Sequence, residues 1–284
     1  MPETTPIISL LTDFGLGSYV GAMKGVMLTI CPDARLVDIT HTVNPQDVLQ
    51  ASSILSTVYP YFPAHTVHLV VVDPGVGTRR RPLALATPHG RFVAPDNGVL
   101  THVLLQESEW QAVALDNETY WRPGPSHTFH GRDIFGPAAA HLARGVALEQ
   151  LGTPVTDLVR LELPRLDVTP HSISGHVASV DHFGNVLTDI GELHWLDEAT
   201  LEFRPLDPDP AGGPPLRFAA DAVRISFGWH IIEGMHHTYS EVPVGQPLAL
   251  VSSSRQLEIA VNQGSAQGKF GVKVGESVQL LARR

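Results

Sequence analysis

The chain has almost no cysteine, an excess of acidic over basic residues, and no long apolar run. Cys31 is its single cysteine, which excludes an intrachain disulfide and a cysteine zinc cluster. Its 19 Lys and Arg face 29 Asp and Glu, and the net charge of -10 argues against nucleic-acid or anionic-membrane partners, because both reward a basic face. No stretch approaches membrane-spanning length, and the polar start carries no basic signal region. We therefore expect a soluble protein of the cytoplasm.

Hydrophobic residues make up 43% of the 284 residues, enough for a substantial core in one large or two medium domains. Strand and helix patterns alternate in the first half, with Ser18 as the expected N-cap of a helix over 19–30, and this alternation favours a layered, mostly parallel sheet. Short strand patterns dominate the second half, which includes a Pro/Gly/Asp loop over 205–215. We predict an α/β domain over 1–155, a proline-containing linker over 156–172 and an antiparallel β domain over 173–284.

The most informative stretch is a loop that follows a β-branched run. Residues 67–72 predict a buried strand, which Asp73, Pro74 and Gly75 end in a tight turn. In an open α/β sheet, ligands bind at the carboxyl ends of such strands. The loop would therefore offer an acid and the three arginines of residues 79–81 to a ligand, although an Asp that only stabilises its own turn is the alternative.

Two further stretches carry residues suited to chemistry. Asp13 follows the strand expected over 6–11, where a carboxylate can accept hydrogen bonds from both hydroxyls of a ribose; a simple turn residue is the alternative. His127, His130 and Asp133 recur every three residues and are of types that bind divalent metals. Surface histidines beside a capping Asp explain the same residues, as does a polar trio of His130 with Asp73 and an arginine.

Six motifs occur together and in order along nearly the whole chain. They are Thr-Asp-Phe-Gly at 12–15, Val-Asp-Pro-Gly-Val-Gly-Thr at 72–78, Ala-Pro-Asp-Asn-Gly at 94–98, Phe-His-Gly-Arg-Asp-Ile-Phe at 129–135, Asp-His-Phe-Gly-Asn at 181–185 and Leu-Glu-Ile-Ala-Val-Asn-Gln-Gly-Ser-Ala at 257–266. In these motifs the chain resembles the S-adenosyl-L-methionine (SAM) hydrolases, also called SAM hydroxide adenosyltransferases. The fluorinase and the chlorinase are relatives of that family.

The resemblance implies that water or hydroxide attacks C5′ of SAM and releases adenosine and L-methionine. The family's water-orienting trio maps onto Asp73, Arg80 and His130, with Arg80 chosen because it lies seven residues after Asp73. Whether Asp73 or His130 takes the proton is left open. The halogenating relatives carry tyrosine at the positions of Asp73 and His130. Because an anionic Asp73 would repel halide, hydrolysis is favoured over halogenation.

The resemblance also implies the substrate contacts and the assembly. The expected contacts are Asp13 with the ribose diol, Asp181 with the methionine ammonium, Phe183 and Tyr239 with the faces of adenine, Asn185 with its edge, Ser254 and Arg255 with the methionine end, and Asn262, with the backbone up to Ser265, at the adenine site. The family's second domain is a β-barrel, and its members form homotrimers with active sites between neighbouring subunits. SAM is the substrate, and neither a cofactor nor a metal is expected.

Two other functions fit parts of the same pattern. A non-catalytic SAM or adenosine sensor on this fold would keep Asp13, Phe183 and Asn185, but it would not need the water-orienting trio. A metal-dependent hydrolase would use His127, His130 and Asp133, and its activity would be sensitive to chelators.

Overall fold

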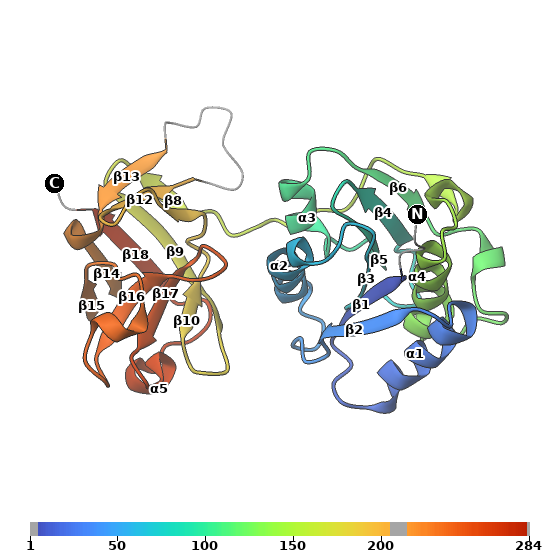
Figure 1. Cartoon of the computed structure of the whole chain (residues 1–284), viewed down its shortest axis with the longest axis horizontal. Helices are drawn as coiled ribbons and strands as arrows, with labels where there is room; N and C mark the ends of the chain where they lie inside the picture. Colours follow the sequence, from blue (N-terminus) through green and yellow to red (C-terminus); the bar gives the residue numbers. More distant parts are fainter. Residues whose placement is uncertain (1–4, 205–214, 283–284) are drawn as a thin grey trace. The chain divides into compact units, whose positions relative to one another are not determined.

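Contacts between Cα atoms divide the chain into two units, Met1–Glu162 and Leu163–Arg284, and each is described by itself (Figure 1). The computed structural model describes residues 5–204 and 215–282. Within these ranges we find no helix with the length and apolar character needed to cross a membrane. Most of the loop expected over 205–215 lies outside the described residues.

The first unit is built on a seven-stranded mixed sheet in the order β2-β1-β3-β5-β4-β6-β7. Its strands are β1 Ile7–Thr12, β2 Arg35–Thr40, β3 Val67–Val71, β4 Pro82–Thr87, β5 Gly90–Pro95, β6 Gln111–Ala114 and β7 Thr153–Pro154. The pairs from β2 through β1 and β3 to β5 are parallel, and the pairs from β5 to β7 are antiparallel. The expected α/β fold is confirmed, and the sheet that was expected to be mostly parallel is mixed.

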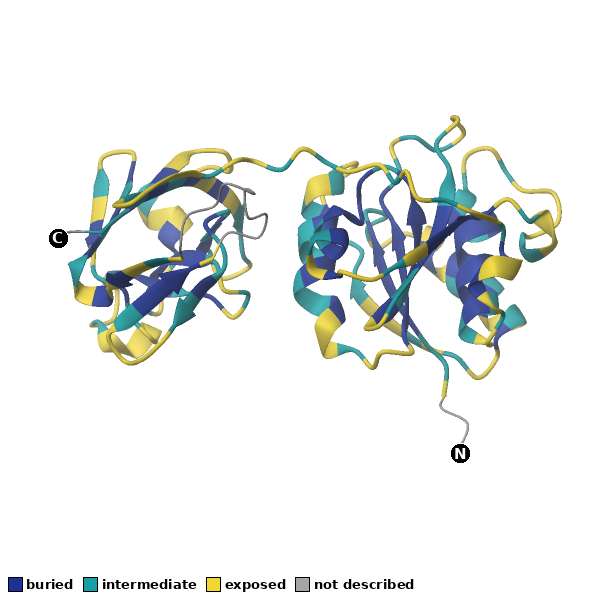
Figure 2. Cartoon of the chain, turned by 90° about the horizontal axis from the view of Figure 1, so that it is seen from above, coloured by how far each residue is buried: buried dark blue, intermediate teal, exposed yellow. Residues whose placement is uncertain are grey.

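Helices cover both faces of this sheet, so that its central strands are buried between them (Figure 2). Helices α1 Ser18–Ile30 and α4 Gly136–Ala143 share one core cluster with β1 and β3, and α2 Val48–Val58 and α3 Thr101–Gln106 share the other. Alternate residues of β3 divide between the two clusters, as the two-residue period of a strand requires. The result is a three-layer α/β/α domain.

The helix starts agree only in part with the sequence. The expected N-cap Ser18 is wrong, because Ser18 is the first helical residue and Gly17 caps α1 without a side-chain hydrogen bond. Asp47, in contrast, caps α2 by accepting a hydrogen bond from the backbone N–H of Gln50. A cap needs a non-helical backbone as well as a suitable side chain, and the sequence reveals only the side chain.

The parallel strands bring three acidic residues to one edge of the sheet. In the register of the sheet, Thr12 at the end of β1 pairs with Val71 at the end of β3, and β5 runs parallel to β3. Asp13, Asp73 and Asp96 each follow one of these strands. They therefore leave the sheet on the same side, where open α/β folds bind their ligands.

The segment after β7 is bound to the first unit. Val155 and Leu158 pack against the core on the α2 and α3 side of the sheet. Arg81 donates hydrogen bonds to the Asp157 carboxylate at 2.8 Å and to its backbone carbonyl at 2.6 Å. Asp96 accepts from the Arg81 guanidinium and from the backbone N–H of Val159. The start of the segment expected as a linker thus contacts the first unit through both apolar and charged groups.

The second unit is a mainly antiparallel β-barrel-like domain. Its strands are β8 Asp167–Thr169, β9 Ser172–Val180, β10 Val186–Thr188, β11 Leu193–Trp195, β12 Thr200–Phe203, β13 Leu216–Ala219, β14 Val223–Phe227, β15 His230–Glu233, β16 Pro247–Val251, β17 Leu257–Val261 and β18 Ser277–Ala282. The main sheet runs β15-β14-β18-β9-β10-β17-β16, and a bridge between His236 and Leu250 nearly closes it. Strands β11–β13 form a separate small sheet, and α5 Ala266–Phe270 follows β17.

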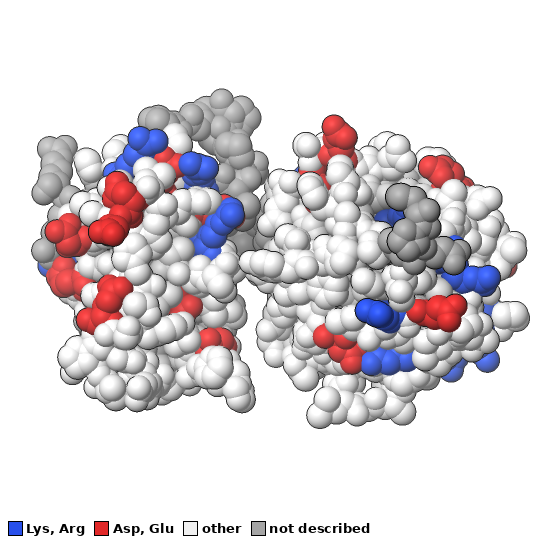
Figure 3. All heavy atoms as spheres, in the orientation of Figure 1, with Lys and Arg blue, Asp and Glu red and all other residues white. Residues whose placement is uncertain are grey.

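Short helical turns connect the elements of both units. They are the 3-10 turns η1 Tyr59–Tyr61, η2 Glu118–Tyr120, η4 Leu148–Gln150, η5 Ala220–Ala222 and η6 Tyr239–Glu241, and the π-helical turn η3 Gly131–Phe135. On the face drawn in Figure 3, Lys and Arg lie among Asp and Glu on both units. The charge on that face is therefore mixed.

A buried histidine makes the first unit sensitive to acid. His68 in β3 is fully buried, accepts or donates one hydrogen bond with Ser9 Oγ at 2.7 Å, and has no partner at Nε2 within the described part of the chain. Burial lowers the pKa of His68 to about 4, well below its value in the unfolded chain. The unfolded chain therefore binds the extra proton first, and folding stability is lost as the pH falls from about 6.5 towards 4.

We expect His68 to lower the free energy of unfolding by about 2 kcal/mol when the pH falls from 7 to 5. In His68→Phe, which preserves the stacking on Phe92, this part of the loss should disappear. Urea unfolding at both pH values measures it, with His65→Asn at a neighbouring exposed position as the control. An unchanged pH dependence in His68→Phe would contradict the assignment.

Candidate active site

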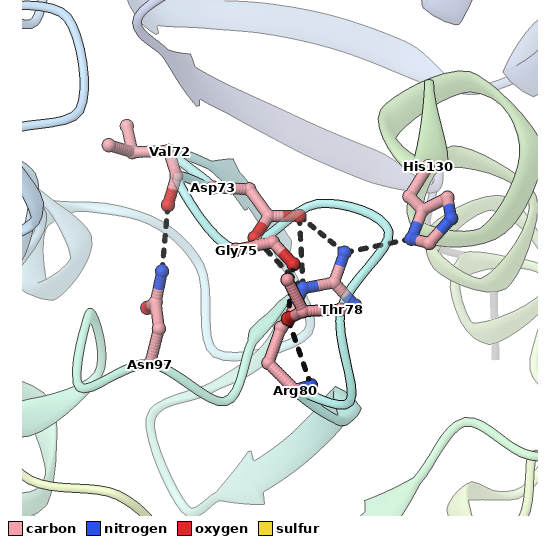
Figure 4. Close-up of polar contacts among 7 residues, drawn as sticks. All are labelled: Val72, Asp73, Gly75, Thr78, Arg80, Asn97 and His130. Atoms are coloured by element: carbon pink, nitrogen blue, oxygen red, sulfur yellow. Dashed lines mark hydrogen bonds and ion pairs between the residues drawn. The ribbon is translucent and has the colours of Figure 1, made fainter. Parts of the chain in front are cut away.

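A network of three side chains lies at the carboxyl edge of the first unit's sheet (Figure 4). Arg80 Nε donates to Asp73 Oδ1 at 2.8 Å and to Oδ2 at 3.0 Å, and its Nη2 donates to Oδ2 as well. The same Nη2 contacts Nδ1 of His130 at 2.8 Å. Side-chain exposure is 9% for Arg80 and 5% for Asp73, so this ion pair is largely buried. The structure places Arg80, and not Arg79 or Arg81, between the acid and the histidine.

The loop that carries Asp73 and Arg80 is fixed by its own turns and by a neighbouring loop. Thr78 Oγ1 donates to the carbonyl of Gly75 at 2.7 Å, and Asn97 Nδ2 donates to the carbonyl of Val72 at 3.0 Å (Figure 4). Gly77 has φ +77°, and a Cβ there would lie 2.8 Å from the carbonyl oxygen of His127. Glycine is therefore required where the two loops meet.

The π-helical turn η3 orients His130, which immediately precedes it. A Cβ at Gly131 would lie 3.1 Å from Met23 Sδ, and it would also touch Phe14 and Val71, so this turn packs closely on α1 and β3. One extra residue per turn is a feature often found at functional sites. The packing fixes the backbone from which the His130 side chain extends.

Asp133 binds other residues of its own segment. Its carboxylate accepts hydrogen bonds from Arg132 at 2.7 and 2.8 Å and from the backbone N–H of Ser126 at 2.8 Å, and it pairs with Arg122 at 3.4 Å. Burial by itself would raise the pKa of Asp133. The hydrogen bonds from Arg132, followed by the other contacts, outweigh burial and hold this pKa below its ordinary value. No group of three or more His, Cys, Asp and Glu is arranged to hold a metal ion in residues 5–204 and 215–282.

The protonation of His130 follows from its partner. A guanidinium has only N–H donors, so Nδ1 of His130 must accept, and in the neutral ring the proton then resides on Nε2. Burial and, next, the positive charge of Arg80 lower the pKa of His130. The arrangement therefore presents an Nε2–H donor from His130 and a carboxylate held by Arg80.

Asp13 lies on the same edge, after β1. Its Oδ2 accepts a hydrogen bond from the backbone N–H of Gln46 at 2.8 Å, and Gln46 has a left-handed φ of +68°. The contact orients the carboxylate against the segment that precedes α2. Such a fixed acid at a strand end suits the hydroxyl groups of a sugar.

Sequence reasoning missed an aromatic cluster beside the network. The rings of Phe14, Tyr19 and Phe129 meet with centroids 5.2 to 6.0 Å apart, and Arg132 stacks over Phe129 at 4.9 Å. Two of the three belong to motifs that also contain Asp13 and His130. The signal available in the sequence was their position directly beside Asp13 and His130.

The second unit gathers the other candidates around β10 and β17. Asp181 Oδ1 accepts from the backbone N–H groups of Phe183 at 2.9 Å and Asn185 at 2.8 Å, and Oδ2 accepts from Asn185 Nδ2 at 2.9 Å. Gly184 has φ +84°, and a Cβ there would clash with Ser265 Oγ at 2.1 Å. The turn is thus rigid, and it leaves Phe183 76% exposed.

Tyr239 and an acid that sequence reasoning did not select lie beside this turn. Tyr239 OH donates to Oε1 of Glu258 at 2.7 Å, and Glu258 is only 5% exposed. Burial first, and then the negative charge of Asp181, raise the pKa of Glu258. Glu258 belongs to the motif at 257–266, where a charged residue within an apolar strand was the available signal.

The remaining candidates lie at opposite ends of β17. Asn262 directly follows the strand and donates from Nδ2 to the carbonyl of Val242 at 2.7 Å. Ser254 and Arg255 lie in the turn before the strand, where Ser254 Oγ donates to Gln256 and Arg255 contacts Glu192 at 3.5 Å. The structure therefore groups Asp181, Asn185 and Tyr239 around Glu258, and it keeps Ser254 and Arg255 in a separate turn.

Comparisons with known proteins cover nearly the whole chain. Residues 8–152 match the family model described as the SAM hydroxide adenosyltransferase N-terminal domain, and residues 175–279 match that of the C-terminal domain. An (R)-S-adenosyl-L-methionine hydrolase of Salinispora tropica is 39% identical over 98% of both chains. A fluorinase of Nocardia brasiliensis is 30% identical over 97% of this chain and 96% of its own.

A solved structure shares the fold. The crystal structure of an uncharacterized conserved protein from Thermotoga maritima is 38% identical to this chain, with a TM-score of 0.84. The alignment covers 96% of this chain and 99% of that one. Both units thus have counterparts in a known structure.

Proposed function

The chain belongs to the SAM hydroxide adenosyltransferase family, and we propose that it is an enzyme that hydrolyses SAM to adenosine and L-methionine. The observation that carries the proposal is the hydrogen-bonded network of Asp73, Arg80 and His130 at the carboxyl edge of the sheet. Relatives named as SAM hydrolases align over almost the whole chain and give further support.

In the proposed reaction, the oxygen of a water molecule forms a bond to C5′ of SAM while the C5′–S bond breaks. The electron pair of that bond goes to sulfur, which changes from a sulfonium to the neutral thioether of methionine. The leaving group therefore needs no acid. What the enzyme must supply is a water molecule that is oriented in line with the breaking bond and an acceptor for its proton.

Asp73 is the proposed proton acceptor. Arg80 occupies Nδ1 of His130, and the other ring nitrogen carries the proton of the neutral form, which leaves His130 suited to donate a hydrogen bond rather than to accept a proton. The Asp73 carboxylate has lone pairs beyond those that Arg80 uses. We propose that His130 orients the water, that Asp73 removes its proton, and that Arg80 fixes both groups.

The substrate contacts expected from the sequence are part of the same proposal. Asp13 would bind the ribose hydroxyls, and the Asp181 carboxylate would pair with the methionine ammonium. Phe183 and Tyr239 would enclose adenine, with Asn185 at its edge. The remaining expected contacts are Asn262 at the adenine site and Ser254 and Arg255 at the methionine end.

The direct test is incubation of the purified protein with SAM, with and without a chelator, followed by chromatography. We expect adenosine and methionine in equal amounts, unaffected by the chelator, since the proposal involves no metal. A 5′-halogenated adenosine formed in the presence of chloride or fluoride would point instead to the chemistry of the fluorinase relatives. Bound but intact SAM would make the protein a sensor, and loss of activity with the chelator would support a metal-dependent hydrolase.

The pH profile tests the role given to His130. Arg80, Asp73, Asp133 and His127 are the charged or titratable groups around it, and its lowered pKa keeps the ring neutral at neutral pH. Protonation of Nδ1 would direct an N–H against the Arg80 N–H groups. We therefore expect kcat/KM to be constant from pH 8 to about 6.5 and to fall below that. The fall should shift or vanish in His130→Gln, and an identical acid limb in that variant would contradict the role.

Homotrimeric assembly with sites shared between subunits is also proposed, from the family resemblance. Light scattering should give three times the 30.7 kDa mass of one chain. Mixing Asp73→Asn chains with Asp181→Asn chains gives a sharper test. If each site combines the first unit of one subunit with the second unit of its neighbour, random mixing restores about one site in four. If no activity were recovered, the sites would not be shared between subunits.

The cytoplasmic location expected from the sequence can be tested by cell fractionation.

A further inference from the structure

Glu258 is buried at a position that would suit an apolar residue. Its cross-strand neighbours are Leu187 in β10 and Leu250 in β16, and Ala260 on the same face of β17 packs with Leu248 and Leu250. Placing a carboxyl group there costs free energy that a leucine would not. The position therefore calls for a reason other than packing.

Its hydrogen bond supplies that reason. Tyr239 lies on the short turn η6 and is 41% exposed, so packing encloses its side chain only in part. The bond from Tyr239 OH to Glu258 Oε1, at 2.7 Å, ties the outer end of this ring to β17, which is paired on both sides in the sheet. The Asp181 turn lies close enough for its charge to influence both groups.

We propose that Glu258 is a positioning residue for nucleoside binding, which acts by holding the ring of Tyr239 in the orientation that receives the adenine base. The inference rests on the proposed function, in which Tyr239 contacts adenine. Glu258 itself does not touch the substrate. Its contribution is to reduce the freedom that the Tyr239 side chain would lose on binding, so that binding is affected more than the chemical step.

Three variants separate the hydrogen bond from charge and packing. Glu258→Leu removes the acceptor and continues the apolar surface of Leu248, Leu250 and Ala260. Glu258→Gln keeps a carbonyl acceptor without the charge, and Tyr239→Phe removes the donor. We expect Glu258→Leu and Tyr239→Phe each to raise KM for SAM about tenfold with kcat within about twofold, and Glu258→Gln to restore KM to within about twofold.

The double variant decides whether Glu258 acts through Tyr239. Adding Glu258→Leu to Tyr239→Phe should change KM by less than about twofold, because the shared bond is already absent. Independent, multiplying effects would overturn the inference. So would a raised KM in Glu258→Gln, since that would mean that the negative charge attracts the substrate directly.

A control distinguishes positioning from general stability. Glu202 in β12 is also a buried acid of the second unit, paired with Arg204 and Arg217. Glu202→Leu should lower the melting temperature without raising KM. If the wild-type protein hydrolyses SAM but Glu258→Leu leaves KM unchanged, the role given to Glu258 is wrong and the proposed function stands. If the wild-type protein does not hydrolyse SAM, the proposed function itself is wrong.

Discussion

Asp73→Asn is expected to lower kcat for SAM hydrolysis about a thousandfold and to leave KM within about threefold of wild type. The substitution preserves size and one oxygen acceptor for Arg80, but an amide cannot take the proton of the attacking water. Adenine and methionine contacts are assigned to other residues, so binding should persist. Single-turnover kinetics with excess enzyme would separate the chemical step from product release.

Asp96→Asn is the matched control for this variant. Asp96 also follows a strand at the same edge, is 6% exposed and is paired with an arginine, Arg81. The Asp96→Asn protein should be less stable, because the substitution breaks a buried ion pair, but its kcat should not fall comparably. Equal losses of kcat in both variants, or a loss confined to KM in Asp73→Asn, would show that Asp73 acts in structure or binding.

Arg80→Lys is the second large effect, with an expected decrease in kcat of about a hundredfold. The charge is retained, but an ammonium on a flexible chain cannot reproduce the planar fork that reaches both oxygens of Asp73 and Nδ1 of His130. Asp73 and His130 would no longer be held by the same side chain. The attacking water of the proposed reaction would therefore be less well aligned. Steady-state kinetics at several pH values would measure this.

The neighbouring arginine provides the comparison for Arg80→Lys. Arg79 precedes Arg80 in the same loop and is exposed, so Arg79→Lys should retain wild-type kcat. A near wild-type kcat for Arg80→Lys would mean that positive charge alone suffices at this position. In that case the contact with His130 would have no catalytic importance.

The first unit could be predicted well from the sequence because its buried strands are largely apolar runs that are followed by Asp, Pro or Gly. Asp73 and Arg80 could be paired from their spacing and the family resemblance, and the geometry brings them together. The π-turn after His130 could not be predicted, because its extra residue depends on the fit of Gly131 against Met23 and Phe14.

The second unit was harder to predict in detail. The small sheet β11–β13 was missed because its strands have only three or four residues, too few for a clear alternation. Glu258 was missed for a different reason. Its importance depends on Tyr239, which is 19 residues away in sequence and meets it only through the tertiary fold.

The bonds of Arg81 and Asp96 to residues 157–159 bear on where the first unit can be separated from the rest of the chain. The family model for the N-terminal domain ends at residue 152, before this segment. A fragment cut there would expose the apolar surface under Val155 and Leu158 and would remove Asp157, one of the two acidic partners of Arg81, the residue next to Arg80. An autonomous first domain should therefore be taken to residue 162.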